Sequence, residues 1–80
     1  MIDPGPLERP KDPPWRQIAD RLRDAIAKGA YPSGAKLPSE KTLCETYGVA
    51  RMTARRALEN LRDDGVIESR PGIGWFVREG

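Results

Sequence analysis

Apolar residues in the segment 15–61 recur at the three- and four-residue spacing of amphipathic helices, in three separate stretches. Proline is tolerated in the first turn of a helix, so the first helix should begin near Pro13 or Pro14, with Asp12 as its cap. Gly29 supplies the stop. The apolar face of this predicted helix consists of Trp15, Ile18, Ala19, Leu22, Ala25 and Ile26.

The second helix follows a segment rich in turn-forming residues. Residues 32–34 should form a turn, and a very short strand is expected at 35–37. Ser39 is a typical helix cap, and Glu40 places an acid in the first turn, where it complements the helix dipole. Gly48 ends this short helix. Its buried side is predicted to be Leu43, Cys44 and Tyr47.

Only the three residues 48–50, "GVA", separate the second helix from the third. Two short helices joined by a tight turn that begins with glycine predict a helix-turn-helix, with Val49 pointing inward. The third helix should run from Arg51 to about Asp64, with Thr53 near its leading end. Its core face is Ala54, Ala57, Leu58 and Leu61. Its outer face is Met52, Arg55, Arg56 and Glu59.

After Gly65 the pattern changes to short strand-like runs at 66–68 and 75–77, separated by the turn-rich "RPGIG". A β-hairpin is therefore predicted, and a hairpin that follows a helix-turn-helix is a wing. Trp75 and Phe76 alternate sides, so we expect one to pack on the core and the other to be more exposed; base stacking is the alternative role. The predicted fold class is mostly α with a small β-hairpin: a winged helix-turn-helix of three helices plus a wing.

Residues 1–14 contain five of the eight prolines and few apolar residues. Because proline lacks a backbone donor and disfavours helix in the residue before it, we predict a flexible, proline-rich tail at 1–14. The winged domain should then occupy 15–78. An 80-residue chain is long enough for only one small core.

The charge distribution is more informative than the net charge of +2. Residues 51–56 hold three arginines and no acid, at the start of the third helix. A helix N-terminus already carries partial positive charge, so cations there do not help the helix to form. This placement favours an anionic partner over the alternative that the arginines are ordinary surface residues.

The composition excludes most catalytic chemistry. The chain has no histidine, one cysteine and no phosphate-binding glycine motif, so we expect neither an enzyme, nor a bound metal, nor a cofactor. Cys44 is read as a small core residue rather than a reactive thiol. No apolar run is long enough to cross a bilayer, the first twenty residues lack a signal-peptide core, and a lone cysteine fits a reducing compartment. These observations predict a cytoplasmic protein.

Five motifs together carry a family resemblance: "LPSE" at 37–40, "YGVAR" at 47–51, "ARRALENL" at 54–61, "DGVI" at 64–67 and "GIGWFV" at 72–77. The chain resembles the N-terminal winged-helix domain of the GntR family of bacterial transcription regulators, and its entrance resembles the HutC-like branch. The resemblance implies sequence-specific binding to double-stranded DNA, most simply by a repressor. Its expected partner is a pseudo-palindromic operator, which two copies of the chain would occupy.

The resemblance also implies contacts for particular residues. Lys41 would lie near phosphate, Arg51 would contact a base, Thr53 and Arg55 match further contact positions, and Gly72 would approach the minor groove.

Other expected DNA contacts come from the residue types themselves. Arg56 would serve phosphates, Arg70 would reach the groove or backbone from the wing, and Met52 would contact a thymine methyl group. Met52 and Arg56 depart from the family pattern, as does Ala50, which forfeits a helix cap.

Two alternatives remain open from the residues alone. A winged helix can serve as a protein–protein interaction module, and RNA binding ranks behind it because no paired exposed aromatics are evident. Family members normally continue into a domain that binds a metabolite and dimerises. We expect an excised domain rather than a naturally short regulator, and an effector ligand only if such a domain is missing from this chain.

Overall fold

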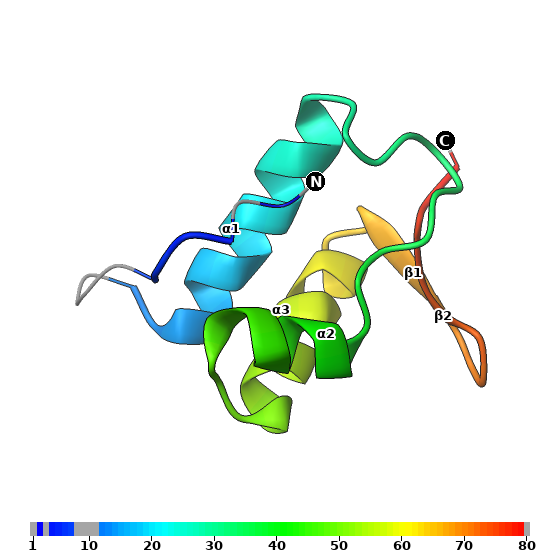
Figure 1. Ribbon diagram of the computed structural model, residues 1–80. Helices are drawn as coiled ribbons and strands as arrows, with labels where there is room; N and C mark the ends of the chain where they lie inside the picture. Colours follow the sequence, from blue (N-terminus) through cyan, green and yellow to red (C-terminus); the bar gives the residue numbers. More distant parts are fainter. Residues whose placement is uncertain (1, 3, 8–11, 80) are drawn as a thin grey trace.

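A computed structural model describes residues 2, 4–7 and 12–79 of the chain. Three helices are followed by a two-stranded antiparallel hairpin (Figure 1). The elements are α1 (Pro14–Ala27), α2 (Glu40–Tyr47), α3 (Arg51–Asp63), β1 (Ile67–Arg70) and β2 (Gly74–Val77). This order confirms the predicted winged helix-turn-helix, with α2 and α3 joined by the expected tight turn.

The ends of the helices test the capping predictions. Ser39 caps α2 as predicted, because its Oγ accepts a hydrogen bond from the Thr42 backbone N–H at 3.1 Å. Gly48 ends α2 in the left-handed conformation, at φ 65°. The prediction that Asp12 caps α1 is wrong, since Pro13 occupies the cap position and makes no side-chain hydrogen bond there. Prolines in the first turn lack N–H groups and leave fewer donors for a cap to satisfy.

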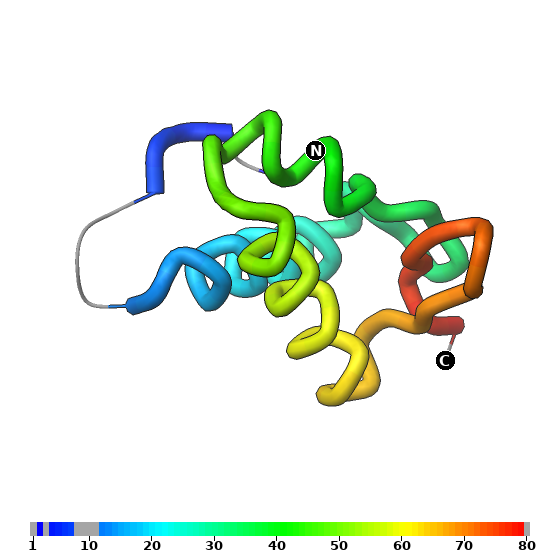
Figure 2. The backbone as a smooth tube through the Cα atoms, turned by 90° about the horizontal axis from the view of Figure 1, so that it is seen from below, coloured from blue at the N-terminus to red at the C-terminus, as the bar shows by residue number. Residues whose placement is uncertain are grey.

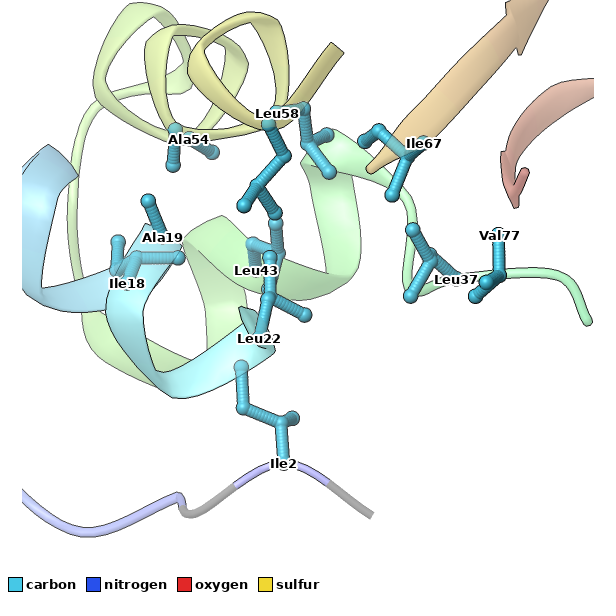
Figure 3. Packing of buried hydrophobic residues seen from close by; sticks show 12 residues of the cluster. Ile2, Ile18, Ala19, Leu22, Leu37, Leu43, Ala54, Leu58, Ile67 and Val77 are labelled. Carbon is cyan, nitrogen blue, oxygen red and sulfur yellow. The ribbon is translucent and has the colours of Figure 1, made fainter. Parts of the chain in front are cut away.

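The core lies where the three helices meet and extends under the hairpin (Figure 3). The predicted core face of α3 is confirmed, because all four of its residues are buried. Leu43 is the one buried residue of α2, while Cys44 and Tyr47 are half-buried against the same cluster. Six larger side chains are fully enclosed: Ile18, Leu22, Leu43, Leu58, Leu61 and Ile67. None of the helices in the described ranges combines the length and hydrophobicity of a transmembrane span.

The hairpin is attached to the core along one of its edges. Ile67 pairs with Val77, and both side chains are buried. The short strand expected at 35–37 is a single bridge, Lys36 to Phe76. Trp75 packs against the core, as predicted for one of the two aromatic residues, whereas Phe76 lies outside the core cluster; both are half-buried. The linker before α2 thus runs beside the hairpin as a third chain segment (Figure 1).

Parts of the N-terminal segment, predicted to be a flexible tail, contact the rest of the domain. Ile2 is only 7% exposed and belongs to the core cluster, and Leu7 packs against that cluster. Figure 3 shows Ile2 pointing toward the side of the core that holds Leu22. The Arg21 guanidinium of α1 donates hydrogen bonds to the carbonyls of Gly5 and Pro6. The prediction of a flexible tail at 1–14 did not include these contacts of Ile2, Leu7 and the Gly5 and Pro6 carbonyls; positions 1, 3 and 8–11 lie outside the described residues.

Replacing Ile2 with serine is expected to lower the free energy of unfolding by about 1–2 kcal/mol, because a nearly buried apolar side chain becomes polar. Urea denaturation followed by circular dichroism measures this change. Pro4→Ser is the matched control, since Pro4 is exposed in the same segment. Equal unfolding free energies for the two variants would show that Ile2 does not pack on the core in solution.

Candidate nucleic-acid interface

The leading end of α3 is exposed and carries cations. Arg51 is the first residue of the helix, and its side chain is 71% exposed. The first turn contains no acid, and Ala50 in the cap position makes no side-chain hydrogen bond, as its residue type predicted. Met52 is 71% exposed. This end of α3 therefore presents backbone donors, a guanidinium group and a thioether to an incoming ligand.

Arg51 and Arg55 of α3 each lie near a carboxylate. The Nε of Arg51 lies 3.7 Å from an Oε of Glu40, and the Nε of Arg55 lies 3.6 Å from an Oε of Glu59. Both arginine side chains remain more than half exposed, while Glu40 is 22% exposed. Long ion pairs whose cation is in contact with solvent contribute about 0–1 kcal/mol. A phosphate or base edge can therefore replace these carboxylates at little cost.

Lys41 lies in the first turn of α2 and is exposed. It makes no ion pair with any residue in the described ranges, so its ammonium group can meet a phosphate directly. Thr53 is half-buried in the first turn of α3, where its backbone N–H donates to the Ala50 carbonyl at 3.0 Å. Lys41 thus belongs to the start of α2, and Arg51 and Thr53 belong to the start of α3.

Arg56 does not join this group. Its guanidinium lies over the Trp15 ring, 4.8 Å from the ring centroid, and so is turned toward α1. Glu59 and Asp63 line the same shallow hollow. The cation–π contact with Trp15 therefore engages the guanidinium of Arg56. The phosphate contact predicted for Arg56 is therefore not supported by its position.

The predicted wing residues have different surroundings. Arg70 is engaged along the hairpin: its Nη2 lies 3.2 Å from an Oε of Glu68, and its guanidinium lies 4.3 Å from the Phe76 ring centroid. Gly72 is exposed at the tip with φ 76°, a conformation that side-chain-bearing residues rarely adopt. The tip can approach a groove closely at Gly72, while Arg70 must leave Glu68 to reach one.

Two further residues lie at or beside the wing tip that the sequence did not indicate as site residues. Ile73 is 62% exposed at the tip. Lys36 lies against the hairpin, and a Cβ added at Gly74 would stand 3.0 Å from its Cε. Lys36 precedes "LPSE" and is far from the wing in sequence, so only the bridge to Phe76 reveals its position. The sequence shows an isoleucine in the turn "PGIG", but only the structure shows that its side chain is exposed.

These elements share one side of the molecule. The start of α3 and the tip of the hairpin both project on the lower side in Figure 1, and the C-terminal end of α1 lies on the opposite side. In the view from below, the hairpin lies to one side of α3 (Figure 2). An exposed helix start beside a projecting hairpin defines a winged helix-turn-helix of the type that nucleic-acid-binding proteins use.

Residues 14–77 match the family model described as bacterial regulatory proteins of the gntR family, and the chain belongs to this family. The family is one of regulatory proteins, in agreement with the expectation that the chain is not an enzyme. The chain is 45% identical over 67 residues to the mannosyl-D-glycerate transport/metabolism system repressor MngR of Escherichia coli K12, which covers 84% of this chain and 28% of MngR. It spans about a quarter of the length of the curated relatives it matches.

Solved structures share the fold. The DNA-binding domain of AraR in complex with operator ORX1 superimposes with a TM-score of 0.87 at 28% identity, over 91% of this chain and 94% of that domain. YtrA from Sulfolobus acidocaldarius, a GntR-family transcription factor, gives 0.82 at 35% identity, over 89% and 74%. The narrower assignment to the HutC-like branch stays a prediction.

Proposed function

We propose that this chain binds double-stranded DNA in a sequence-specific manner and acts as the DNA-binding part of a transcription repressor. The observation that carries the proposal is the exposed Arg51 at the start of α3, on the same side of the molecule as the hairpin tip. The repressor name of MngR and the operator complex of the AraR domain support it.

In the proposed mechanism, the first half of α3 enters the major groove. The fork of Arg51 can donate two hydrogen bonds to O6 and N7 of one guanine, which no other base offers as a pair of acceptors. Met52 contributes an apolar contact to a thymine methyl group, and Thr53 hydrogen-bonds nearby. Arg55 exchanges Glu59 for a phosphate, and Lys41 contacts the backbone from the start of α2.

The wing supplies the second set of proposed contacts. Gly72 allows the backbone of the tip to approach the minor groove. Arg70 contacts a phosphate after it leaves Glu68, at small cost because that pair is exposed. Phosphate contacts of this kind fix the register of the protein on the duplex without reading its sequence.

The proposal extends to assembly and location. Two copies of the domain would occupy the halves of a pseudo-palindromic operator, as winged and other helix-turn-helix dimers do. An additional domain would respond to any effector and would raise affinity by linking the two copies. A bacterial operator lies in the cytoplasm, which is where we propose that the protein acts.

The direct test is a salt titration with the purified chain and a random duplex, followed by selection of bound duplexes from a random pool. Binding should weaken steeply as salt rises, because cations released from DNA drive association. Selection should then enrich a common motif. If no salt-sensitive binding occurs, the proposal fails, and the alternative of a protein–protein module gains support.

Lys41→Ala should weaken binding to selected and random duplexes equally and reduce the logarithmic salt slope by about one unit. The physical reason is the loss of one phosphate contact that carries no sequence information. Fluorescence anisotropy at several salt concentrations measures both quantities. Lys28→Ala removes the same charge at the opposite end of the molecule, where Lys28 pairs with Asp24, and should leave the slope unchanged. A change in sequence preference with Lys41→Ala would contradict a phosphate role.

A further inference from the structure

The tip of the wing presents an apolar side chain to solvent. Ile73 and Met52 are the two large hydrophobic residues exposed in the described ranges, and Ile73 is the one at the hairpin tip. The turn is closed by a hydrogen bond from the Ile73 N–H to the Arg70 carbonyl at 2.9 Å. Glycines flank Ile73 on both sides, so no neighbouring Cβ shields it. Folding of the domain gains nothing from this exposed side chain.

A cation is held next to that tip. Gly74 has no Cβ, and one placed there would meet the Lys36 stem at 3.0 Å, so the glycine makes room for the lysine to lie along the hairpin. Lys36 makes no ion pair within the described part of the chain, whereas Arg70 is already engaged by Glu68. Residues 69–78 contain no acid. The tip therefore combines an exposed apolar side chain with a lysine that has no ion-pair partner among the described residues.

We propose that Ile73 and Lys36 make the wing selective for A·T over G·C pairs in the minor groove. This inference rests on the proposed DNA-binding function. The isoleucine side chain has no hydrogen-bond acceptor, and in the minor groove guanine presents its N2 amino group as a donor. When the isoleucine side chain covers this amino group, the group loses its bound water and has no hydrogen-bond partner. An A·T pair presents no such donor in the minor groove. A·T-rich segments also narrow the minor groove and deepen its negative potential, which attracts Lys36.

The experiment uses a duplex recovered from the random pool with the full chain. Each base pair that flanks the contact of α3 is replaced in turn by A·T, by G·C and by deoxyinosine·dC. The inosine pair keeps the major-groove pattern of G·C but lacks the N2 amino group. At the pairs under the wing, the wild-type chain should bind A·T and inosine forms alike and the G·C form about tenfold more weakly.

Two variants assign the effect to the named residues. Ile73→Asn supplies an acceptor for the guanine amino group, so the discrimination should fall to about twofold or less, mainly through tighter binding of the G·C form. Lys36→Ala should weaken binding of the A·T form by several-fold, because it removes the charge at the narrow groove. Lys28→Ala is the control of equal charge and should leave all three affinities unchanged. Ile73 is exposed, so its replacement leaves the fold intact.

The outcomes separate this inference from the proposed function. If no duplex shows salt-sensitive, selective binding, the proposed function itself fails. If selective binding occurs but A·T and G·C forms bind equally, or the inosine form follows G·C, the minor-groove amino group is not being read and the inference is overturned. Discrimination that survives in Ile73→Asn would also overturn it.

Discussion

Replacing Arg51 with alanine is expected to weaken binding to the selected duplex by about 1–3 kcal/mol, a factor of about 5 to 150, and to relax one operator position. Its side chain is the most accessible of the arginine partners in the ion pairs of α3. Its contact with Glu40 is long, at 3.7 Å, and leaves the guanidinium in contact with solvent, so the pair holds Arg51 only weakly. A bidentate guanine contact is specific because both acceptors must be in place. Affinity for a scrambled duplex should fall less, since only charge is lost there.

Two further variants separate the effect of the Arg51 charge from that of its planar guanidinium group and of its position. Arg51→Lys keeps the charge but lacks the planar fork, so it should retain binding to the scrambled duplex while losing discrimination at the same position. Arg62→Ala removes an exposed arginine from the far end of α3 and should change neither quantity. Anisotropy titrations with matched and scrambled duplexes give all the affinities. Unchanged affinity of Arg51→Ala for both duplexes would remove Arg51 from the base-reading contact.

The parts of the fold that follow from local spacing were predictable. The buried face of α3 consists of four small or aliphatic residues at helical spacing. Ser39 and Gly48 mark the two ends of α2, because the cap hydrogen bond and the left-handed backbone conformation involve only residues close in sequence. The hairpin was predictable because the spacing of apolar residues changes after Gly65 from that of a helix to that of short strands. Such signals depend on neighbours in sequence, so they need no knowledge of the tertiary arrangement.

The features that were missed depend on residues far apart in the chain. Nothing local shows that Ile2 reaches the core, that Lys36 lies along the wing, or that Trp15 receives the guanidinium of Arg56. The assignment of Arg56 to phosphates rested on its place in a cluster of arginines, and a contact across to α1 changed that interpretation. Exposure at the start of α3 was correctly expected, but the approach of Glu40 from the start of α2 was not.

The site depends on the core because α2 has only one fully buried anchor. Leu43 is 0% exposed, and no other residue of α2 is buried. Figure 3 shows its side chain in the middle of the cluster, among residues from α1 and α3. The tight turn and the start of α3 follow directly from α2. Loss of this anchor should therefore disturb the presentation of Arg51 as well as the stability of the domain.

Leu43→Ala is expected to lower the free energy of unfolding by about 2–5 kcal/mol, the usual cost of a buried leucine truncation that leaves a cavity. A domain of this size has a total stability of about 4–12 kcal/mol, so a loss of 3 kcal/mol should lower Tm by about 12–24 °C. Thermal and urea denaturation measure the change, with exposed Thr46→Ala on the same helix as the control. DNA affinity should fall with the folded fraction, and it should recover on cooling toward the temperature of maximum stability. A Leu43→Ala chain that is as stable as Thr46→Ala would mean that α2 is held by something other than this side chain.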